Sequence, residues 1–225
     1  TVPPMIGLIG GTFDPIHFAH LRLAEEAREA LRLDAVWFVP NARPPHRAPP
    51  VASAEHRAAM VARAIANAPA FRLERCELER RDQPSYTVVT LETVRQRIGA
   101  NTPLFWLVGA DAFAGLDRWH RWRAVLSLAH LVVATRPGTT LSEAALSPAL
   151  RPLWAARRTP DAVATADRLP PAGWVIALPI THLAISATAI RERIAGGRSA
   201  RYLLPDAVLG YIEHHRLYRK DHEVV

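Results

Sequence analysis

Short apolar runs alternate with helix-length segments along most of this chain, and this alternation restricts the folds open to it. The first run, Met5 to Ile9, ends at Gly10-Gly11, as a buried parallel strand does at a tight turn. Strands separated by helices indicate βαβ units, in which helices cover both faces of a mostly parallel sheet. The sequence therefore predicts an α/β fold with a doubly wound, mostly parallel sheet.

The later elements follow the same pattern. We expect further strands at residues 35–39, 71–77, 104–108, 130–135 and 174–178, and helices at residues 21–33, 53–68, 86–98, 121–128 and 188–195. A terminal helix is expected after Pro205, with one face formed by Val208, Tyr211, Ile212 and His215. Residues 136–173 are rich in alanine and proline, which predicts irregular structure with one or two short helices. Since no repeat or clear linker occurs, we expect residues 1–225 to form a single domain with a C-terminal helical extension.

The charge is unusual for a chain of otherwise ordinary composition. The formal net charge is +7, and because Lys220 is the only lysine the other basic residues are arginines. A basic surface attracts nucleic acid or phosphorylated small molecules. The arginines are scattered along the chain, however, and a codon bias towards arginine on solvated faces would give the same distribution. Charge alone therefore does not decide the function.

The single cysteine, Cys76, excludes an internal disulfide and a cysteine-rich zinc site. No run of about 18 apolar residues occurs, and the N-terminus lacks the basic-then-apolar layout of a signal peptide. These features predict a cytoplasmic protein that does not span a membrane. The oligomeric state is left open by the sequence.

A glycine-rich turn at residues 10–20, GGTFDPIHFAH, carries the most informative chemistry. Gly10 and Gly11 let backbone N–H groups approach a phosphate, and the N-terminus of the following helix adds a favourable dipole. His17 and His20 are three residues apart, so they share a face if both lie in the first turn and can donate hydrogen bonds to phosphate oxygens. The alternative is that both histidines merely cap the helix.

Other signatures of nucleotide and metal sites fail. The chain has no G-x-x-x-x-G-K-[ST], and Gly7, Gly10 and Gly11 do not form G-x-G-x-x-G, so P-loop and dehydrogenase sites lose their support. A zinc site at His17 and His20 lacks both the H-E-x-x-H pattern and a third ligand. We therefore expect no metal held by protein ligands.

A second segment, residues 185–191, ISATAIR, follows the last predicted strand. Ser186 or Thr188 can cap the next helix, and Arg191 can reach an anion at the same helix terminus. Capping alone would explain the hydroxyl groups, so this segment carries little weight by itself. Combined with the glycine-rich turn, it predicts two strand-to-helix phosphate sites in one sheet.

These two segments resemble the H-x-G-H-type and I-S-x-T-x-I-R-type elements of the nucleotidyltransferase superfamily. Further motifs narrow the resemblance to the bacterial nicotinate-nucleotide adenylyltransferases: Val39-Pro40-Asn41 with Pro44-Pro45-His46-Arg47, Ser85-Tyr86-Thr87, Gly109-Ala110-Asp111 with Trp119-His120, Arg136-Pro137-Gly138, Tyr202-Leu203-Leu204-Pro205 and Tyr211-Ile212. One departure is Ala19, where the family usually has glycine between the histidines.

The resemblance implies a Rossmann-like nucleotidyltransferase that transfers AMP from ATP to nicotinate mononucleotide and releases pyrophosphate. It implies catalytic roles for His17, His20 and Arg191. It implies ATP contacts at Gly10, Gly11, Thr12, Phe13, Gly109, Asp111, Ser186 and Thr188. It implies mononucleotide contacts at Asn41, Arg47, Thr87 and Trp119. For Trp119 the less favoured alternative is core packing. Mg²⁺ would be bound through the ATP phosphates.

Two other functions remain open at this point. A transferase of the same superfamily could use phosphopantetheine or an alcohol phosphate, although the middle motifs argue against it. A nucleic-acid binder is supported only by the charge of +7. The chain lacks the interleaved aromatic and basic residues of single-strand binders and any helix-turn-helix or zinc-finger pattern. We therefore expect ATP and nicotinate mononucleotide as partners, and no nucleic acid or membrane.

Overall fold

The computed structural model describes residues 2–159 and 169–220, and its centre is one parallel sheet. The strands are β1 (Ile6–Gly11), β2 (Ala35–Pro40), β3 (Phe71–Leu73), β4 (Leu104–Gly109), β5 (His130–Thr135) and β6 (Val175–Pro179). They lie in the order β3-β2-β1-β4-β5-β6, and each neighbouring pair is parallel. The direction in which the chain winds across the sheet therefore reverses between β1 and β4, which confirms the predicted doubly wound α/β fold.

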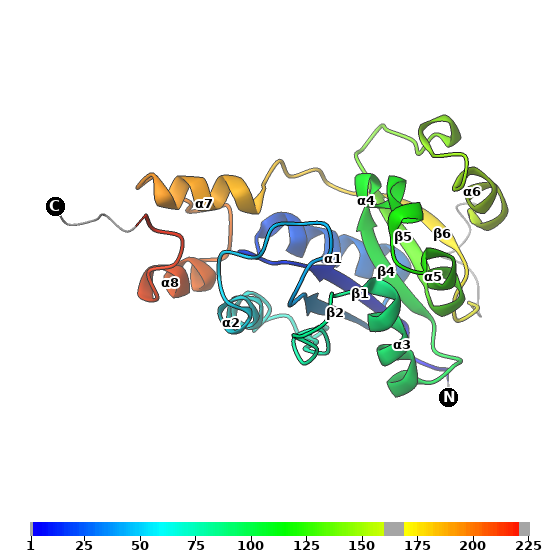
Figure 1. The fold of residues 1–225 in the computed structure, drawn as a ribbon, viewed down its shortest axis with the longest axis horizontal. Coiled ribbons are helices and arrows are strands. Elements are labelled where there is room, and N and C mark those ends of the chain that lie inside the picture. The colour runs from blue at the N-terminus through cyan, green and yellow to red at the C-terminus, as the bar shows by residue number, and fades with distance from the viewer. Residues whose placement is uncertain (1, 160–168, 221–225) are drawn as a thin grey trace.

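Helices cover the sheet and extend it at one end. They are α1 (Phe18–Leu31), α2 (Ala54–Ala64), α3 (Thr87–Ile98), α4 (Ala110–Ala114), α5 (Trp122–Leu128), α6 (Arg151–Arg157), α7 (Ala187–Ala195) and α8 (Asp206–His214), with short 3₁₀ turns η1 (Leu116–Arg118) and η2 (Glu143–Ala145). Figure 1 shows α7 and α8 at the end of the molecule where the chain terminates, away from α5 and α6. This is the predicted C-terminal helical extension. Among the described residues, no helix combines the length and the apolar character needed to cross a bilayer.

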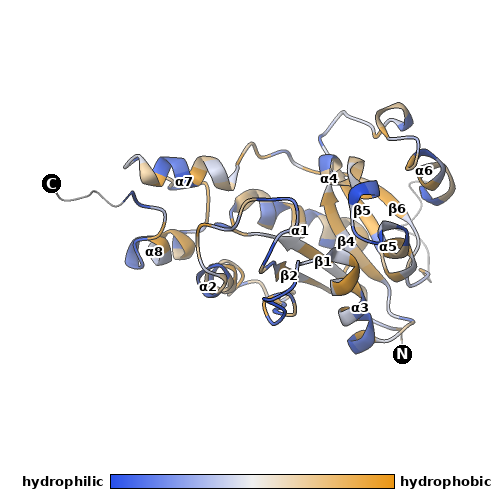
Figure 2. Cartoon of the chain, in the orientation of Figure 1, coloured by the Kyte–Doolittle hydropathy of each residue, from blue (hydrophilic) through white to orange (hydrophobic). Residues whose placement is uncertain are grey.

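Two apolar cores lie on the two faces of the sheet. Residues of β1 alternate between them, since Ile9 packs with α1, α2, α7 and α8, whereas Leu8 packs with α3 to α6. Both side chains are buried, as expected for a strand covered on both faces. Figure 2 shows the same layering, with apolar strands at the centre and hydrophilic residues on the outer faces of the helices.

Some predicted boundaries were wrong, and the structure gives the reasons. Helix α1 begins at Phe18, a turn before the predicted residue 21, because two histidines cap it. Strand β3 ends at Leu73 instead of residue 77, because the Glu74 carboxylate accepts the Cys76 N–H (3.0 Å) and the chain turns there. Helix α2 ends at Ala64, short of residue 68. The five-residue helix α4 was not predicted, since it is too short to show a helical period.

Residues 136–173 were predicted to be irregular with one or two short helices, and this is confirmed for the part that the structure describes. Residues 136–159 contain only the short elements η2 and α6, and residues 169–173 have no regular structure. Residues 160–168 of this prediction lie outside the described residues. Helix α7 stops at Gly196, as predicted, and the following Gly197 has a left-handed backbone (φ 70°) that suits glycine.

Gly10 makes room for an aromatic side chain from the neighbouring strand. A Cβ atom at Gly10 would lie 2.6 Å from Cη2 of Trp106, a side chain of β4 that is largely buried. A Cβ atom at Gly109 would instead meet no atom within 4 Å. The absence of a side chain at position 10 is therefore a packing requirement, whereas position 109 faces open space.

We predict that Gly10→Ala lowers the free energy of unfolding by about 1–3 kcal/mol, because the added methyl group forces the Trp106 indole out of its position. Gly109→Ala is the matched control, and its effect should stay within about 0.5 kcal/mol. Urea unfolding of the two variants and the wild type measures both values. Equal stability of the Gly10→Ala protein and the wild type would contradict this account of the packing.

Candidate active site

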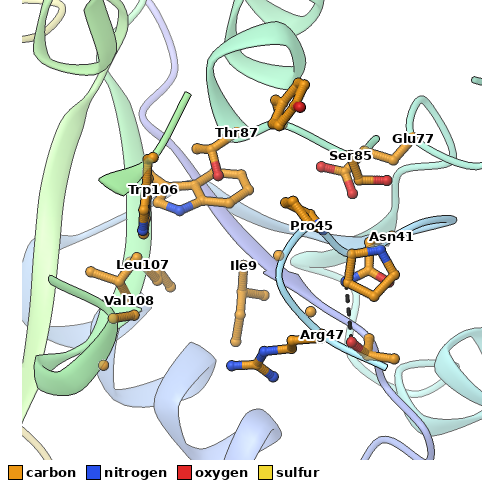
Figure 3. Close-up of a pocket in the computed structure, with 18 of the residues that line it drawn as sticks. Ile9, Asn41, Pro45, Arg47, Glu77, Ser85, Thr87, Trp106, Leu107 and Val108 are labelled. Atoms are coloured by element: carbon orange, nitrogen blue, oxygen red, sulfur yellow. Dashed lines mark hydrogen bonds between the residues drawn. The ribbon is translucent and has the colours of Figure 1, made fainter. Parts of the chain in front are cut away.

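A cavity of about 370 Å³ opens at the carboxyl ends of β1 and β4. This is the point where the strand order reverses, and open α/β sheets bind ligands in the crevice that forms there. The walls come from the turn after β1, residues 41–47, the start of α3 and the end of β4. Figure 3 shows Arg47, Thr87 and Trp106 facing this cavity from three different segments. We call it the first cavity.

A second cavity of about 500 Å³ lies on the other side of Gly109. It is lined by Asp111, by the end of β5 and the following residues 136 and 139–141, and by residues 180–183 after β6. The last segment is fastened to α1, because Glu26 accepts hydrogen bonds from the N–H (2.9 Å) and hydroxyl (3.2 Å) of Thr181. Gly109 and Leu23 line both cavities, so two ligands can meet at this boundary.

His17 and His20 cap the first turn of α1 reciprocally. Nδ1 of His17 accepts the N–H of Ala19 (3.2 Å), and Nδ1 of His20 accepts the N–H of His17 (3.1 Å). The two rings stack with their centroids 3.8 Å apart. In a neutral imidazole, an accepting Nδ1 leaves the proton on Nε2. Capping therefore prepares both histidines to donate a hydrogen bond from Nε2.

Burial keeps both rings neutral at physiological pH. It lowers the pKa of His17 from 6.5 to about 4. Burial also lowers the pKa of His20 well below its usual value, and the neighbouring His17 adds to the effect. The positive end of the α1 dipole has the same effect on the pKa of both rings, since it disfavours an added positive charge. The histidines thus act as neutral hydrogen-bond donors.

The turn after β1 is fixed to the loop after β2 by a buried cation. Arg57 is 1% exposed, and its Nη1 donates to the backbone carbonyls of Thr12 (2.8 Å) and Asn41 (2.7 Å). The Asn41 side-chain amide also donates to the Thr12 hydroxyl (3.2 Å), a bond drawn in Figure 3. Thr12 and Asn41 both line the first cavity. Arg57 therefore sets the spacing of two cavity walls.

A neutral carboxyl group and an aromatic pair complete the first cavity. Burial raises the pKa of Glu77 to about 8, against the hydrogen bond that it accepts from the Thr90 hydroxyl (2.7 Å). The group is thus largely protonated at pH 7 and repels an anion little. Tyr86 and His120 stack with their centroids 4.3 Å apart beside Trp119 in the same wall.

Helix α7 brings a second helix N-terminus to the turn after β1. Its N-cap is Ser186, whose hydroxyl oxygen accepts the Ala189 N–H (3.1 Å), so the capping expected for this hydroxyl occurs. Arg191 Nη1 donates to the backbone carbonyl of Asp14 (2.8 Å), and its Nη2 lies 3.4 Å from the Thr188 hydroxyl. The two segments that suggested phosphate sites are thereby joined, although they are far apart in sequence.

The structure brings most of the predicted site residues together. Those that line the first cavity are Gly10, Gly11, Thr12, His20, Asn41, Arg47, Thr87, Gly109 and Trp119, and Asp111 lines the second. Ser186, Thr188 and Arg191 lie outside both cavities, at the start of α7. The ring of Phe13 is buried against His20 and Phe38, so only its backbone can reach a ligand.

Several lining residues were not predicted. In the first cavity they include Trp106, Glu77, Tyr86 and His120, and in the second Thr139, Thr181 and His182. Tyr86 and His120 directly neighbour the predicted Thr87 and Trp119, so their motifs gave a signal. His182 gave none, because it lies in an irregular segment that reaches the site only through the fold.

The low pKa of His17 makes stability depend on pH. The unfolded chain takes up this proton near pH 6.5 and the folded chain only near pH 4, so stability falls as the pH decreases through that window. The asparagine in His17→Asn can still cap α1. We predict that the free energy of unfolding of this variant falls by about 2 kcal/mol less than that of the wild type between pH 7 and pH 4.5. Urea unfolding at the two pH values measures this difference, and parallel losses would contradict it.

Comparisons with known proteins agree with this geometry. The model of the cytidylyltransferase-like family matches residues 8–193. A probable nicotinate-nucleotide adenylyltransferase from Dechloromonas aromatica is 49% identical over 214 residues, which cover 95% of this chain and 97% of that protein. A protein of the same description from Pseudomonas aeruginosa is 48% identical over 96% of this chain and 98% of its own length.

Solved structures share the fold at low sequence identity. Plasmodium falciparum nicotinic acid mononucleotide adenylyltransferase complexed with NaAD has a TM-score of 0.70 and 17% identity, with 96% of this chain and 97% of that chain covered. A putative nicotinate-nucleotide adenylyltransferase from Vibrio parahaemolyticus has a TM-score of 0.64 and 14% identity, with 96% of each chain covered. With curated relatives at nearly half identity over almost the whole length, the chain belongs to the nicotinate-nucleotide adenylyltransferase family.

Proposed function

We propose that this protein transfers the AMP group of ATP to nicotinate mononucleotide, giving nicotinate adenine dinucleotide and pyrophosphate. One observation carries the proposal at the level of the site. Two cavities, large enough for the two halves of a dinucleotide, meet at Gly109, and His20 lies on the wall of the first. A bond formed between two bound nucleotides would lie at that boundary.

The first cavity suits the mononucleotide. Trp119 and the stacked pair Tyr86 and His120 offer flat aromatic surfaces to a pyridine ring. The Arg47 side chain, which Figure 3 shows at the cavity, offers a cation to the phosphate. Thr87 begins α3, so a carboxylate bound there would meet backbone N–H groups of the first helical turn.

The second cavity suits the adenosine of ATP. Asp111 can accept hydrogen bonds from ribose hydroxyls, and the segments after β5 and β6 form the remaining walls. At the start of α7, the β- and γ-phosphates would be bound by Ser186, Thr188 and Arg191. Ser186 accepts its capping bond through oxygen and keeps its own proton to donate. Arg191 adds a positive charge at the same place.

The chemistry needs no activating base. A phosphate oxygen of the mononucleotide forms a bond to the α-phosphorus of ATP while the bond from that phosphorus to the bridging oxygen of pyrophosphate breaks. Catalysis then depends on in-line positioning and on stabilising the charge on the phosphoryl oxygens. We assign this stabilisation to the Nε2–H groups of His20 and His17, with His20 nearest the α-phosphate because it lines the cavity.

We also propose that Mg²⁺ reaches the site bound to the ATP phosphates. Within residues 2–159 and 169–220, no three His, Cys, Asp or Glu side chains gather in a way that could hold a metal ion. Asp14 is already engaged by three hydrogen-bond donors. When bound, Mg²⁺ neutralises phosphate charge, and it commonly keeps several water ligands, which fits this donor set.

The proposed function is tested by pyrophosphate release from ATP and Mg²⁺ with nicotinate mononucleotide, nicotinamide mononucleotide or phosphopantetheine as the acceptor. We expect rapid release with the acid, since its carboxylate can accept the backbone N–H groups at the start of α3. Slower release is expected with the amide, whose NH₂ group cannot. Equal rates with the acid and the amide would support AMP transfer but contradict the specificity for the acid. Release with phosphopantetheine alone would overturn the proposed acceptor.

His20→Ala should reduce kcat by about a hundredfold or more, because it removes a donor to the charge that develops on the phosphoryl group. Initial rates at saturating substrate measure the effect. His214→Ala, at the last residue of α8, is the control and should retain the wild-type rate. Circular dichroism checks that the variant keeps the helix content of the wild type. Near-normal turnover of His20→Ala would remove this residue from the assigned role.

A further inference from the structure

The Asp14 carboxylate is a buried junction that the reaction does not use directly. Asp14 is 3% exposed. Its carboxylate accepts the backbone N–H groups of Val51 (2.7 Å) and Ala52 (3.1 Å), and Arg57 binds the Ala52 carbonyl (3.1 Å). The turn that carries the histidines is therefore fixed to the segment before α2.

The third donor to Asp14 comes from the other end of the chain. The Tyr218 hydroxyl donates to Oδ1 of Asp14 at 2.6 Å across 204 residues of sequence. Burial and the hydrogen bond to Asp14 raise the pKa of Tyr218, which keeps this hydroxyl protonated as a donor. Tyr218 itself is 8% exposed, so the contact is shielded from water.

Unfavourable backbone geometry on both sides of this contact indicates that it is firmly held. Arg216 (φ 53°) and Tyr218 (φ 63°) both have left-handed backbones, and so does Phe13 (φ 50°) beside Asp14. Such conformations cost free energy in residues other than glycine and persist where the surrounding contacts enforce them. The chain after α8 thus bends in this way to bring the Tyr218 ring back to Asp14.

The same residue, Asp14, also holds Arg191. The Asp14 backbone carbonyl accepts Arg191 Nη1 at 2.8 Å, while its carboxylate accepts Tyr218. A shift of Asp14 would therefore move the guanidinium at the start of α7. The C-terminal segment is in this way coupled to the phosphate-binding side of the site.

We infer that Tyr218 is a positioning residue for the ATP phosphates: its hydroxyl fixes Asp14, and Asp14 in turn orients the Arg191 guanidinium. This inference rests on the proposed function. It adds that the residue acts on ATP and pyrophosphate and leaves the mononucleotide unaffected, since the first cavity is built without Tyr218.

Steady-state kinetics of Tyr218→Phe test the inference, with Tyr211→Phe as the matched control. Both variants lose one hydroxyl hydrogen bond of the C-terminal segment, since the Tyr211 hydroxyl lies 2.7 Å from Nδ1 of His56 on α2 in a part-buried contact. For Tyr218→Phe we expect kcat/KM for ATP to fall on the order of tenfold. The KM for the mononucleotide should change less than about twofold. Tyr211→Phe should match the wild type in both.

A double-mutant cycle with Arg191→Lys separates positioning from a general structural effect. If Tyr218 acts through Arg191, Tyr218→Phe costs much less in the Arg191→Lys background than in the wild type. Additive losses, or equal losses for ATP and the mononucleotide, would overturn the inference. If Tyr218→Phe does not fold by circular dichroism, Asp14→Asn perturbs the same junction, because its NH₂ group cannot accept a hydrogen bond and one of the three donors loses its partner. The expected fall in kcat/KM for ATP is the same.

The wild-type rate distinguishes a failure of the proposed function from a failure of the role inferred for Tyr218. An inactive wild type with both substrates would overturn the proposed function itself. An active wild type with Tyr218→Phe indistinguishable from Tyr211→Phe would leave the proposed function standing and refute the role of Tyr218.

Discussion

The reversal of strand order between β1 and β4 is the constraint on which the rest of the structure depends. Chain winding in opposite directions from these two strands sends α1 to one face of the sheet and α4 to the other, and a crevice forms between them. Both cavities open there, and Gly109, at the end of β4, lies between them. Every other element of the site either forms a wall of this crevice or holds one in place.

The histidines show that a side chain can cap a helix and still offer a hydrogen-bond donor to a ligand. Capping and ligand binding looked like alternatives from the spacing of His17 and His20. In the structure each ring uses Nδ1 for the helix and keeps Nε2–H for a ligand, so the first role sets the tautomer needed for the second. Because burial lowers the pKa of His17 to about 4 and that of His20 well below its usual value, both rings are neutral, and in the proposed role they would bind phosphate without adding a charge.

Sequence patterns predicted the sheet and most helices because buried strands and amphipathic helices leave periods of two and 3.6 residues. They failed where a side chain overrides the period, as at Glu74, or where a helix is as short as α4. Residues within a motif, such as Thr87, could be predicted to lie at the site from the family pattern, and Thr87 does line the first cavity. His182 and Arg57 could not, because their roles exist only once distant segments are folded together. Ala19 also shows its place only in the structure, where it lines the second cavity.

The bond between Asp14 and Tyr218 has a consequence for the order in which the protein is made. The hydroxyl that completes the set of donors to Asp14 is synthesised 204 residues after Asp14 itself. The sheet can assemble in the meantime, since β1 to β6 all precede residue 180. The junction at Asp14 therefore remains incomplete until Tyr218 has been synthesised. An incomplete chain truncated before Tyr218 could fold its sheet and yet lack the finished active site.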